Sequence, residues 1–188
     1  LMEQCQKGSM CAVLNTDLDV ISGVCKKVEN ETNNIVSPAN LNSPKQTVIS
    51  GTTEGVELAI KYLKDAGHKK CIKLNVHVAS HSNVMIDAID EFKKELDMIN
   101  MSMPNHKIIH NVDNESSTDI DELKNKLLNQ LTNPVRWSNT MEYIKKHNGI
   151  VIECGPNNVL SGLARSNGID KVYSTFSRNF IHEIKSAL

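Results

Sequence analysis

The pattern of apolar residues between Gly8 and Val78 constrains the fold of this chain more than any other feature. Runs of strand length or strand-like alternation are interleaved with segments whose apolar residues recur at helical spacing. In chain order the predicted elements are a strand at residues 9–14, a helix at 17–28, strands at 35–39 and 47–50, a helix from a cap at 51–53 to Gly67, and a strand at 71–78. This β-α-β-β-α-β order is that of a ferredoxin-like unit, so we expect residues 8–78 to form a small subdomain.

Strands and helices alternate again after residue 79. The predicted elements are helices at 83–99, 120–131, 138–146, 159–165 and 181–188, and strands at 107–111, 150–154 and 172–176. Such alternation favours a parallel or mixed sheet with helices on both faces. The fold class that we expect is therefore α/β, with residues 1–7 and 79–188 belonging to one larger domain.

Charge and cysteine usage exclude several classes of protein. The formal net charge is -1 with both signs interspersed, so no electrostatic footprint for nucleic acid or for a membrane surface is present. No apolar run approaches the roughly 20 residues of a membrane-spanning helix, and no signal peptide opens the chain. Five cysteines form an odd set without a CxxC pair, which argues against a disulfide framework and a zinc site. We expect a soluble protein from a reducing compartment, without a cysteine-rich zinc site.

Serines give no direct evidence of a nucleophile. A serine hydrolase on such a sheet would have the pattern G-x-S-x-G at a strand-to-helix turn, and the 188 residues contain none. Ser9 and Ser161 each have one neighbouring glycine, and we interpret both as structural. No GxGxxG, Walker or HExxH pattern is present either, which leaves nucleotide and metal sites without support.

His81 is the most informative of the seven histidines. It directly follows a predicted strand, where active-site residues of α/β proteins gather, although a hydrogen-bonded loop histidine remains an open interpretation. Gln130 lies near the end of a predicted helix, where a carbonyl without an intrahelical partner can accept a bond from an imidazole, or where its side chain simply faces solvent. Asn40 and Asn42 lie in the segment 40–46, whose Asn, Ser and Pro residues predict a hairpin turn.

Five blocks of the sequence together resemble successive blocks of one enzyme family. They are GSMCAVL at residues 8–14, SPANLNSPKQTVISG at 37–51, HVASHSNVM at 77–85, NQLTNPVRW at 129–137 and ECGPNNVLSGL at 153–163. Their order and spacing are similar to those of the malonyl-CoA:acyl-carrier-protein transacylases. The resemblance covers nearly the whole chain and implies a hydrolase-like mixed-sheet domain, incomplete here, with an inserted ferredoxin-like subdomain.

The resemblance also implies roles for four residues. His81 matches the family's general base and acid, and Gln130 matches the residue whose main-chain carbonyl orients that imidazole. Asn40 and Asn42 match substrate-binding residues near the mouth of the cleft between subdomains. The implied reaction moves malonyl from coenzyme A through a serine ester to the phosphopantetheine thiol of acyl carrier protein, in type II fatty acid synthesis. It requires no cofactor, and bacterial cytoplasm or a plastid-like organelle fits it.

Two departures from the family pattern limit what the resemblance implies. The family's glycine after Gly-Pro is Asn157 here, a tolerable exchange because asparagine accepts left-handed backbone geometry. The family's serine elbow, malonate-binding arginine and oxyanion-hole loop all precede the match to Leu1. We therefore expect an N-terminal portion of the same enzyme to be a partner of this chain, and the chain alone to be inactive.

Two alternatives stay open on the sequence. One is a non-catalytic module that binds a carrier protein through the ferredoxin-like unit. The other is an acyltransferase domain of a larger synthase with a different acyl specificity. An upstream reading frame that encodes G-x-S-x-G and a downstream arginine would favour the enzyme over the binding module.

Overall fold

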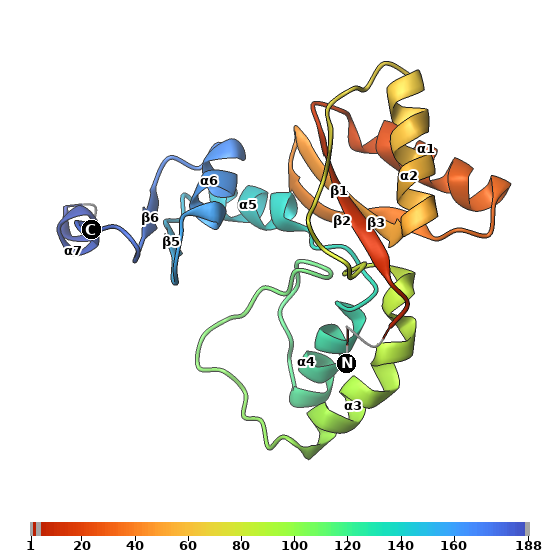
Figure 1. The fold of residues 1–188 in the computed structure, drawn as a ribbon. Helices are drawn as coiled ribbons and strands as arrows, with labels where there is room; N and C mark the ends of the chain where they lie inside the picture. Colours follow the sequence, from red (N-terminus) through yellow and green to blue (C-terminus); the bar gives the residue numbers. More distant parts are fainter. Residues whose placement is uncertain (1, 3–4, 187–188) are drawn as a thin grey trace. The chain divides into compact units, whose positions relative to one another are not determined.

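The computed structural model describes residues 2 and 5–186, and Figure 1 shows their path. The chain divides into two compact units, residues 1–136 and 137–188, and each is described by itself. The first contains β1 (Gly8–Leu14), α1 (Leu18–Glu31), β2 (Val36–Ser43), β3 (Gln46–Thr52), α2 (Thr53–Asp65), β4 (Cys71–Lys73), the 3₁₀-helix η2 (Asn83–Ala88), α3 (Ile89–Met98) and α4 (Ile120–Asn129). The β-α-β-β-α-β order predicted for its first part is confirmed.

The strands of this unit form one four-stranded sheet in the order β2-β3-β1-β4, with every neighbouring pair antiparallel. Helices α1 and α2 lie on one face of the sheet (Figure 1). The core beneath them consists of Cys11, Val13, Ile21, Cys25, Val28, Val36, Ile49, Val56, Ala59 and Leu63. Each of its larger aliphatic side chains contributes about 1.5–3 kcal/mol by leaving water, so this core holds both helices on the sheet.

Helix α2 begins and ends where the sequence predicts. The Thr52 hydroxyl accepts a hydrogen bond from the Gly55 amide at 3.1 Å, which satisfies one of the free amides of the first turn. Gly67 follows the helix with a φ of 94°, a conformation that glycine adopts without a steric cost. The local sequence therefore sets both ends of this helix.

Two predicted strands differ from the structure: one is shorter than expected, and the other is absent. The strand expected over residues 71–78 ends at Lys73, and only isolated bonds from Leu74 to Met10 and from Gly8 to His77 continue the pairing. The alternation misled because its apolar members, such as Ile72 at 55% exposure, face outward. The strand expected at 107–111 is a loop, whose backbone bonds go to a turn and to Arg136 in place of a neighbouring strand.

Two further predictions change in form. The single helix expected over 83–99 is the 3₁₀-helix η2 followed by α3, so its first turns have tighter i to i+3 bonding. The turn expected over residues 40–46 is shorter, because β2 extends through Ser43 before the chain reverses at Pro44 and Lys45. Irregular pairing between Pro38 and Ser43 allows the strand to continue through this asparagine-rich segment.

The second unit is built around a pair of parallel strands. Its elements are α5 (Trp137–Lys146), β5 (Val151–Glu153), α6 (Val159–Ser166), β6 (Val172–Ser174) and α7 (Phe180–Lys185), while residues 187–188 of the last predicted helix lie outside the described residues. The carboxylate of Glu153 accepts the amides of Leu160 and Ser161 at 3.0 and 2.8 Å. A carboxylate at the start of α6 complements the positive end of the helix dipole and ties the helix to β5.

The parallel pair confirms part of the predicted sheet, whereas the residue 8–78 strands form a separate antiparallel sheet. Among the described residues, no helix has the length and apolar character that crossing a membrane requires.

Gly51 provides a test of the packing between β2 and β3. A Cβ atom at this position would lie 2.0 Å from the Ile35 carbonyl oxygen, so Gly51→Ala must push the backbone apart. We expect a loss of about 1–3 kcal/mol in the free energy of unfolding, measured by denaturant titration. The matched control is Gly23→Ala in α1, where nothing lies within 4 Å of the new atom. It should stabilise the protein by about 0.5–1 kcal/mol; equal effects of the two changes would contradict the packing.

Candidate active site

His81 lies in a tight turn at the end of the irregular segment that follows β4. Its φ is 61°, an uncommon conformation for a residue with a side chain. The Ser82 hydroxyl donates to the Ala79 carbonyl at 2.7 Å, which closes the turn around His81. Ala79 is fully buried, and it can approach β1 because Gly8 has no side chain: a Cβ there would lie 2.5 Å from the Ala79 Cβ. Packing and one hydrogen bond thus hold His81 in a strained conformation.

The imidazole of His81 meets the main chain of Gln130. The distance from His81 Nδ1 to the Gln130 carbonyl oxygen is 2.8 Å, which confirms the predicted hydrogen bond. A carbonyl oxygen can only accept, so Nδ1 carries the proton and Nε2 of the neutral ring has a free lone pair. His81 is half-buried, which leaves its ring accessible. The arrangement has the form of a general base with a fixed tautomer.

The carbonyl of Gln130 is placed by the end of α4 and by the residues that follow it. Gln130 is the C-cap residue, and its side-chain amide donates to the Asn133 carbonyl at 2.8 Å. After Pro134 the chain pairs with the outer edge of β2: the Val135 amide donates to Ala39 and the Leu41 amide donates to Val135, both at 2.8 Å. The helix end is thereby attached to the sheet.

Asn40 and Asn42 lie within strand β2 and not in the hairpin turn that the sequence predicted. Asn40 forms the isolated parallel bridge with Val135, so it is joined through the main chain to the segment that follows Gln130. Asn42 lies further along the same strand, and both side chains are half-buried. The structure therefore brings together His81 and Gln130 and links Asn40 to them through Val135, while the substrate-binding role of the two asparagines stays a prediction.

Two cavities open beside the His81 turn. One, of about 390 Å³, is lined by Asn83 next to the turn and by Thr132, Pro134 and Leu41 near the end of α4. The other, of about 430 Å³, is lined by His77 and Ser80 on the preceding side of the turn and by Met10 of β1.

Sequence reasoning did not find the residues that support His81. Nothing in the sequence indicated that Ser82 and Gly8 support His81. Ser82 was notable only for following a histidine, and Gly8 only for directly preceding a predicted strand. Lys126, discussed below, had a detectable one: Glu122 and Lys126 have the i,i+4 spacing of a helical ion pair. Within the described part of the chain, no three His, Cys, Asp or Glu side chains come together as a possible metal site.

Comparison with known proteins gives consistent matches. The family model "Acyl transferase domain" matches residues 1–172. The malonyl CoA-acyl carrier protein transacylase of Bacillus subtilis is 39% identical over 160 residues, which are 85% of this chain and 50% of that protein. The chain thus spans about half the length of the curated relatives that it matches.

Solved structures show the same similarity. An acyl carrier protein S-malonyltransferase from Vibrio cholerae aligns with a TM-score of 0.91 at 32% identity, covering 97% of this chain and 61% of that one. A complex of a type II PKS acyl-carrier protein with its malonyl-transacylase aligns with a TM-score of 0.86 at 32% identity, covering 97% of this chain and 59% of that one. These structures have the mixed α/β fold seen here.

The hydrogen bond between His81 and the Gln130 carbonyl can be tested by changing the Gln130 side chain, which does not take part in it. Because the acceptor is the main-chain oxygen of Gln130, Gln130→Ala should leave neutral His81 in the tautomer with the proton on Nδ1. NMR of isotope-labelled ring nitrogens measures this directly. His147 is an internal control, since its Nδ1 also lies 2.8 Å from a main-chain oxygen, that of Tyr143. A mixture of tautomers for His81 but not for His147 in the variant would show that the glutamine side chain is needed.

Proposed function

Because this chain belongs to the acyl transferase domain family, we propose that it supplies the general base and acid of a malonyl-CoA:acyl-carrier-protein transacylase of type II fatty acid synthesis. The observation that carries the proposal is the 2.8 Å bond from His81 Nδ1 to the Gln130 carbonyl oxygen. This bond directs the free lone pair of Nε2 away from α4, as a base that acts on a hydroxyl or a thiol requires.

The first half of the reaction forms an acyl-enzyme. His81 Nε2 takes the proton of the nucleophilic serine hydroxyl while the serine oxygen bonds to the thioester carbon of malonyl-CoA. The carbon–sulfur bond then breaks, and the imidazolium gives its proton to the coenzyme A thiolate that leaves. The Gln130 carbonyl, which already accepts the Nδ1 proton, stabilises the positive charge that the ring carries between the two steps.

The second half reverses these roles. His81 takes the proton of the phosphopantetheine thiol, whose sulfur attacks the serine ester. The carbon–oxygen bond breaks and the serine oxygen recovers a proton from the imidazolium. Each half-reaction thus begins and ends with a neutral His81, so no cofactor is needed to balance protons or electrons.

We assign the nucleophile to a segment outside these 188 residues, because they contain no G-x-S-x-G. The proposal assigns the serine, the malonate-binding arginine and the oxyanion-hole loop to an N-terminal portion of the same enzyme. Support comes from the length of the relatives, of which this chain spans about half. Oxyanion-hole amides in that portion would provide the electrostatic stabilisation of the tetrahedral intermediate.

The subdomain description belongs to the same proposal. Residues 8–78 are assigned to a ferredoxin-like subdomain, supported by the strand order β2-β3-β1-β4 and by two helices on one sheet face. Residues 1–7 and 79–188 are assigned to a hydrolase-like domain, supported by the parallel pairing of β5 and β6. The boundary after Val78 stays a prediction, because residues 79–136 belong to the same compact unit as the sheet.

The partners proposed are malonyl-CoA and acyl carrier protein, in bacterial cytoplasm or a plastid-like organelle. The similar malonyl-transacylase in complex with its acyl-carrier protein supports the second partner. Asn40 and Asn42 are assigned to the substrate cleft, because β2 is bonded through Val135 to the segment after Gln130. A synthase domain with another acyl specificity is the second candidate, since the residue that would select a carboxylate lies outside this chain.

The site of acylation provides one test. Residues 1–188 alone should form no acyl-enzyme with labelled malonyl-CoA, whereas the full-length protein should carry label on a serine outside this segment. Intact-mass analysis and peptide mapping locate the label. Malonyl on a serine of a verified 188-residue chain would refute the assignment of the nucleophile.

Histidine substitution provides a second test. In the full-length protein, His81→Ala should lower kcat/KM for malonyl transfer by about 10²–10⁴-fold, the usual contribution of general acid–base catalysis. His147→Ala is the matched control, because that ring makes the same kind of main-chain bond on another helix. A His81→Ala variant with activity near that of the control would assign the base to another residue.

A further inference from the structure

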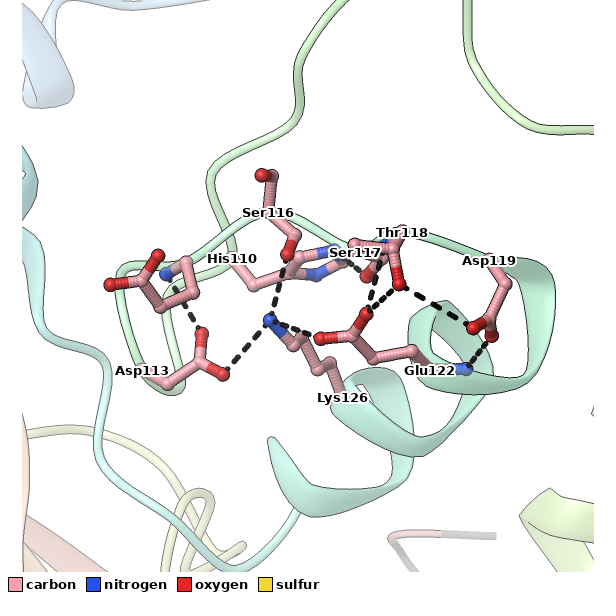
Figure 2. A network of polar contacts seen from close by, with 9 residues as sticks. His110, Asp113, Ser116, Ser117, Thr118, Asp119, Glu122 and Lys126 are labelled. Atoms are coloured by element: carbon pink, nitrogen blue, oxygen red, sulfur yellow. Dashed lines mark hydrogen bonds and ion pairs between the residues drawn. The ribbon is translucent and has the colours of Figure 1, made fainter.

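A polar network centred on Lys126 joins helix α4 to the loop that precedes it (Figure 2). The Lys126 ammonium lies 3.1 Å from a carboxylate oxygen of Asp113 and 3.1 Å from one of Glu122. It also donates to the Ser116 main-chain oxygen at 3.1 Å. The lysine side chain is only 9% exposed, a degree of burial that a lysine tolerates when its charge is paired. Lys126 therefore joins α4 to two points of the preceding loop, Asp113 and Ser116.

The same network continues along one face of α4. Asp119 caps the helix by accepting the Glu122 amide at 2.8 Å. Glu122 in turn accepts the amide and hydroxyl of Thr118 at 2.8 and 2.9 Å, a variant of the capping box, and its other oxygen binds Lys126. One turn further, the Lys126 carbonyl accepts the Gln130 amide at 3.1 Å. Side-chain and main-chain contacts thus lead from the start of the helix to the residue that orients His81.

The loop is also bound beyond the end of the helix. The Arg136 amide donates to the Asn111 carbonyl, and the Arg136 Nε donates to the Val112 carbonyl, both at 2.9 Å. The Asn114 side chain donates to the Arg136 carbonyl at 3.2 Å. The loop therefore contacts α4 at Lys126 and the chain again at Arg136. The last turn of α4, with Gln130, lies in sequence between these two attachments.

Charges in the network remain paired near neutral pH. Burial lowers the pKa of Lys126, but its bonds to Glu122 and Asp113 outweigh this effect and the pKa is raised overall. The hydrogen bond from the Thr118 amide, together with those from Lys126 and the Thr118 hydroxyl, lowers the pKa of Glu122 to about 2. Both groups are ionised over the range in which a histidine base works.

We infer that Lys126 is a positioning residue for the general base: it fixes the last turn of α4 so that the Gln130 carbonyl stays within hydrogen-bond reach of His81. The inference rests on the proposed function of His81 and extends it to a residue that touches no substrate. A helix of ten residues such as α4 is marginal without external contacts. Lys126 supplies such contacts one turn before the Gln130 carbonyl, in addition to the burial of Leu128 and the ion pair of Lys124 with Asp97 of α3.

The test compares Lys126→Met with Lys126→Arg in the full-length protein. Lys126→Met keeps most of the apolar side chain but leaves two carboxylates without their cation, so kcat for malonyl transfer should fall about 10-fold, in line with the cost of small misplacements in an active site. KM for malonyl-CoA should stay within about twofold of the wild-type value, since the lysine contacts no substrate. Lys126→Arg restores the charge and should recover most of the loss.

A readout independent of turnover is the tautomer of neutral His81. Lys126→Met should give a mixture of the two ring tautomers, because the Nδ1 bond loses its fixed acceptor, and Lys126→Arg should retain the Nδ1–H form. Lys146→Met is the matched control: it removes another i,i+4 ion pair, with Glu142 at 3.0 Å on α5, and should change neither kcat nor the tautomer.

Asp113→Asn is a second variant that tests the same inference if Lys126→Met does not fold. It removes one carboxylate partner of Lys126 and should produce the same tautomer mixture to a smaller extent. A folded Lys126→Met or Asp113→Asn protein with the wild-type tautomer would overturn the inference, even if kcat fell. If the wild-type full-length protein shows no malonyl transfer, while Lys126→Met still changes the His81 tautomer, the proposed function is refuted and the positioning role stands.

Discussion

The hydrogen bond between His81 Nδ1 and the Gln130 carbonyl is the interaction on which the candidate site depends. It joins two segments that are 49 residues apart in sequence, the turn after β4 and the end of α4. Each of them is attached to the same antiparallel sheet: the turn through the contact of Ala79 with Gly8 of β1, and the helix end through the pairing of Val135 with β2. The sheet therefore sets the distance between base and carbonyl, and a change in either attachment alters the orientation of the imidazole.

A strained residue lies on one side of this bond, and a buried, paired charge lies one helical turn before the other side. His81 adopts a positive φ, which costs about 1–3 kcal/mol for such backbone conformations, and the Ser82 hydroxyl together with the burial of Ala79 offsets that cost. On the other side, the buried Lys126 ammonium is balanced by Glu122 and Asp113. The Gln130 carbonyl, at the end of a helix that is attached to the sheet through Val135, fixes the orientation of the His81 ring.

The sequence predicted those elements that are determined by residues close together in the chain. The order of strands and helices over residues 8–78 and the Thr52 cap follow from periodicity and from capping chemistry, and the left-handed φ of 73° at Asn157 agrees with the tolerance of asparagine for that geometry. The roles of His81 and Gln130 came from the family resemblance, because periodicity cannot bring together a turn and a distant helix end. The prediction of a strand at 107–111 was wrong because a strand needs a neighbouring strand, and periodicity does not show which segments lie side by side. The ion pair between Lys126 and Asp113 is equally non-local, although the Glu122–Lys126 spacing was visible.

We propose that His81 acts on a serine supplied from outside these residues, and a crystal structure of the full-length protein trapped as its malonyl-serine intermediate would test this. The serine oxygen should lie within about 3.2 Å of His81 Nε2, with Nδ1 still bonded to the Gln130 carbonyl. A malonylated serine far from His81, or beside a different base, would show that His81 does not act on it.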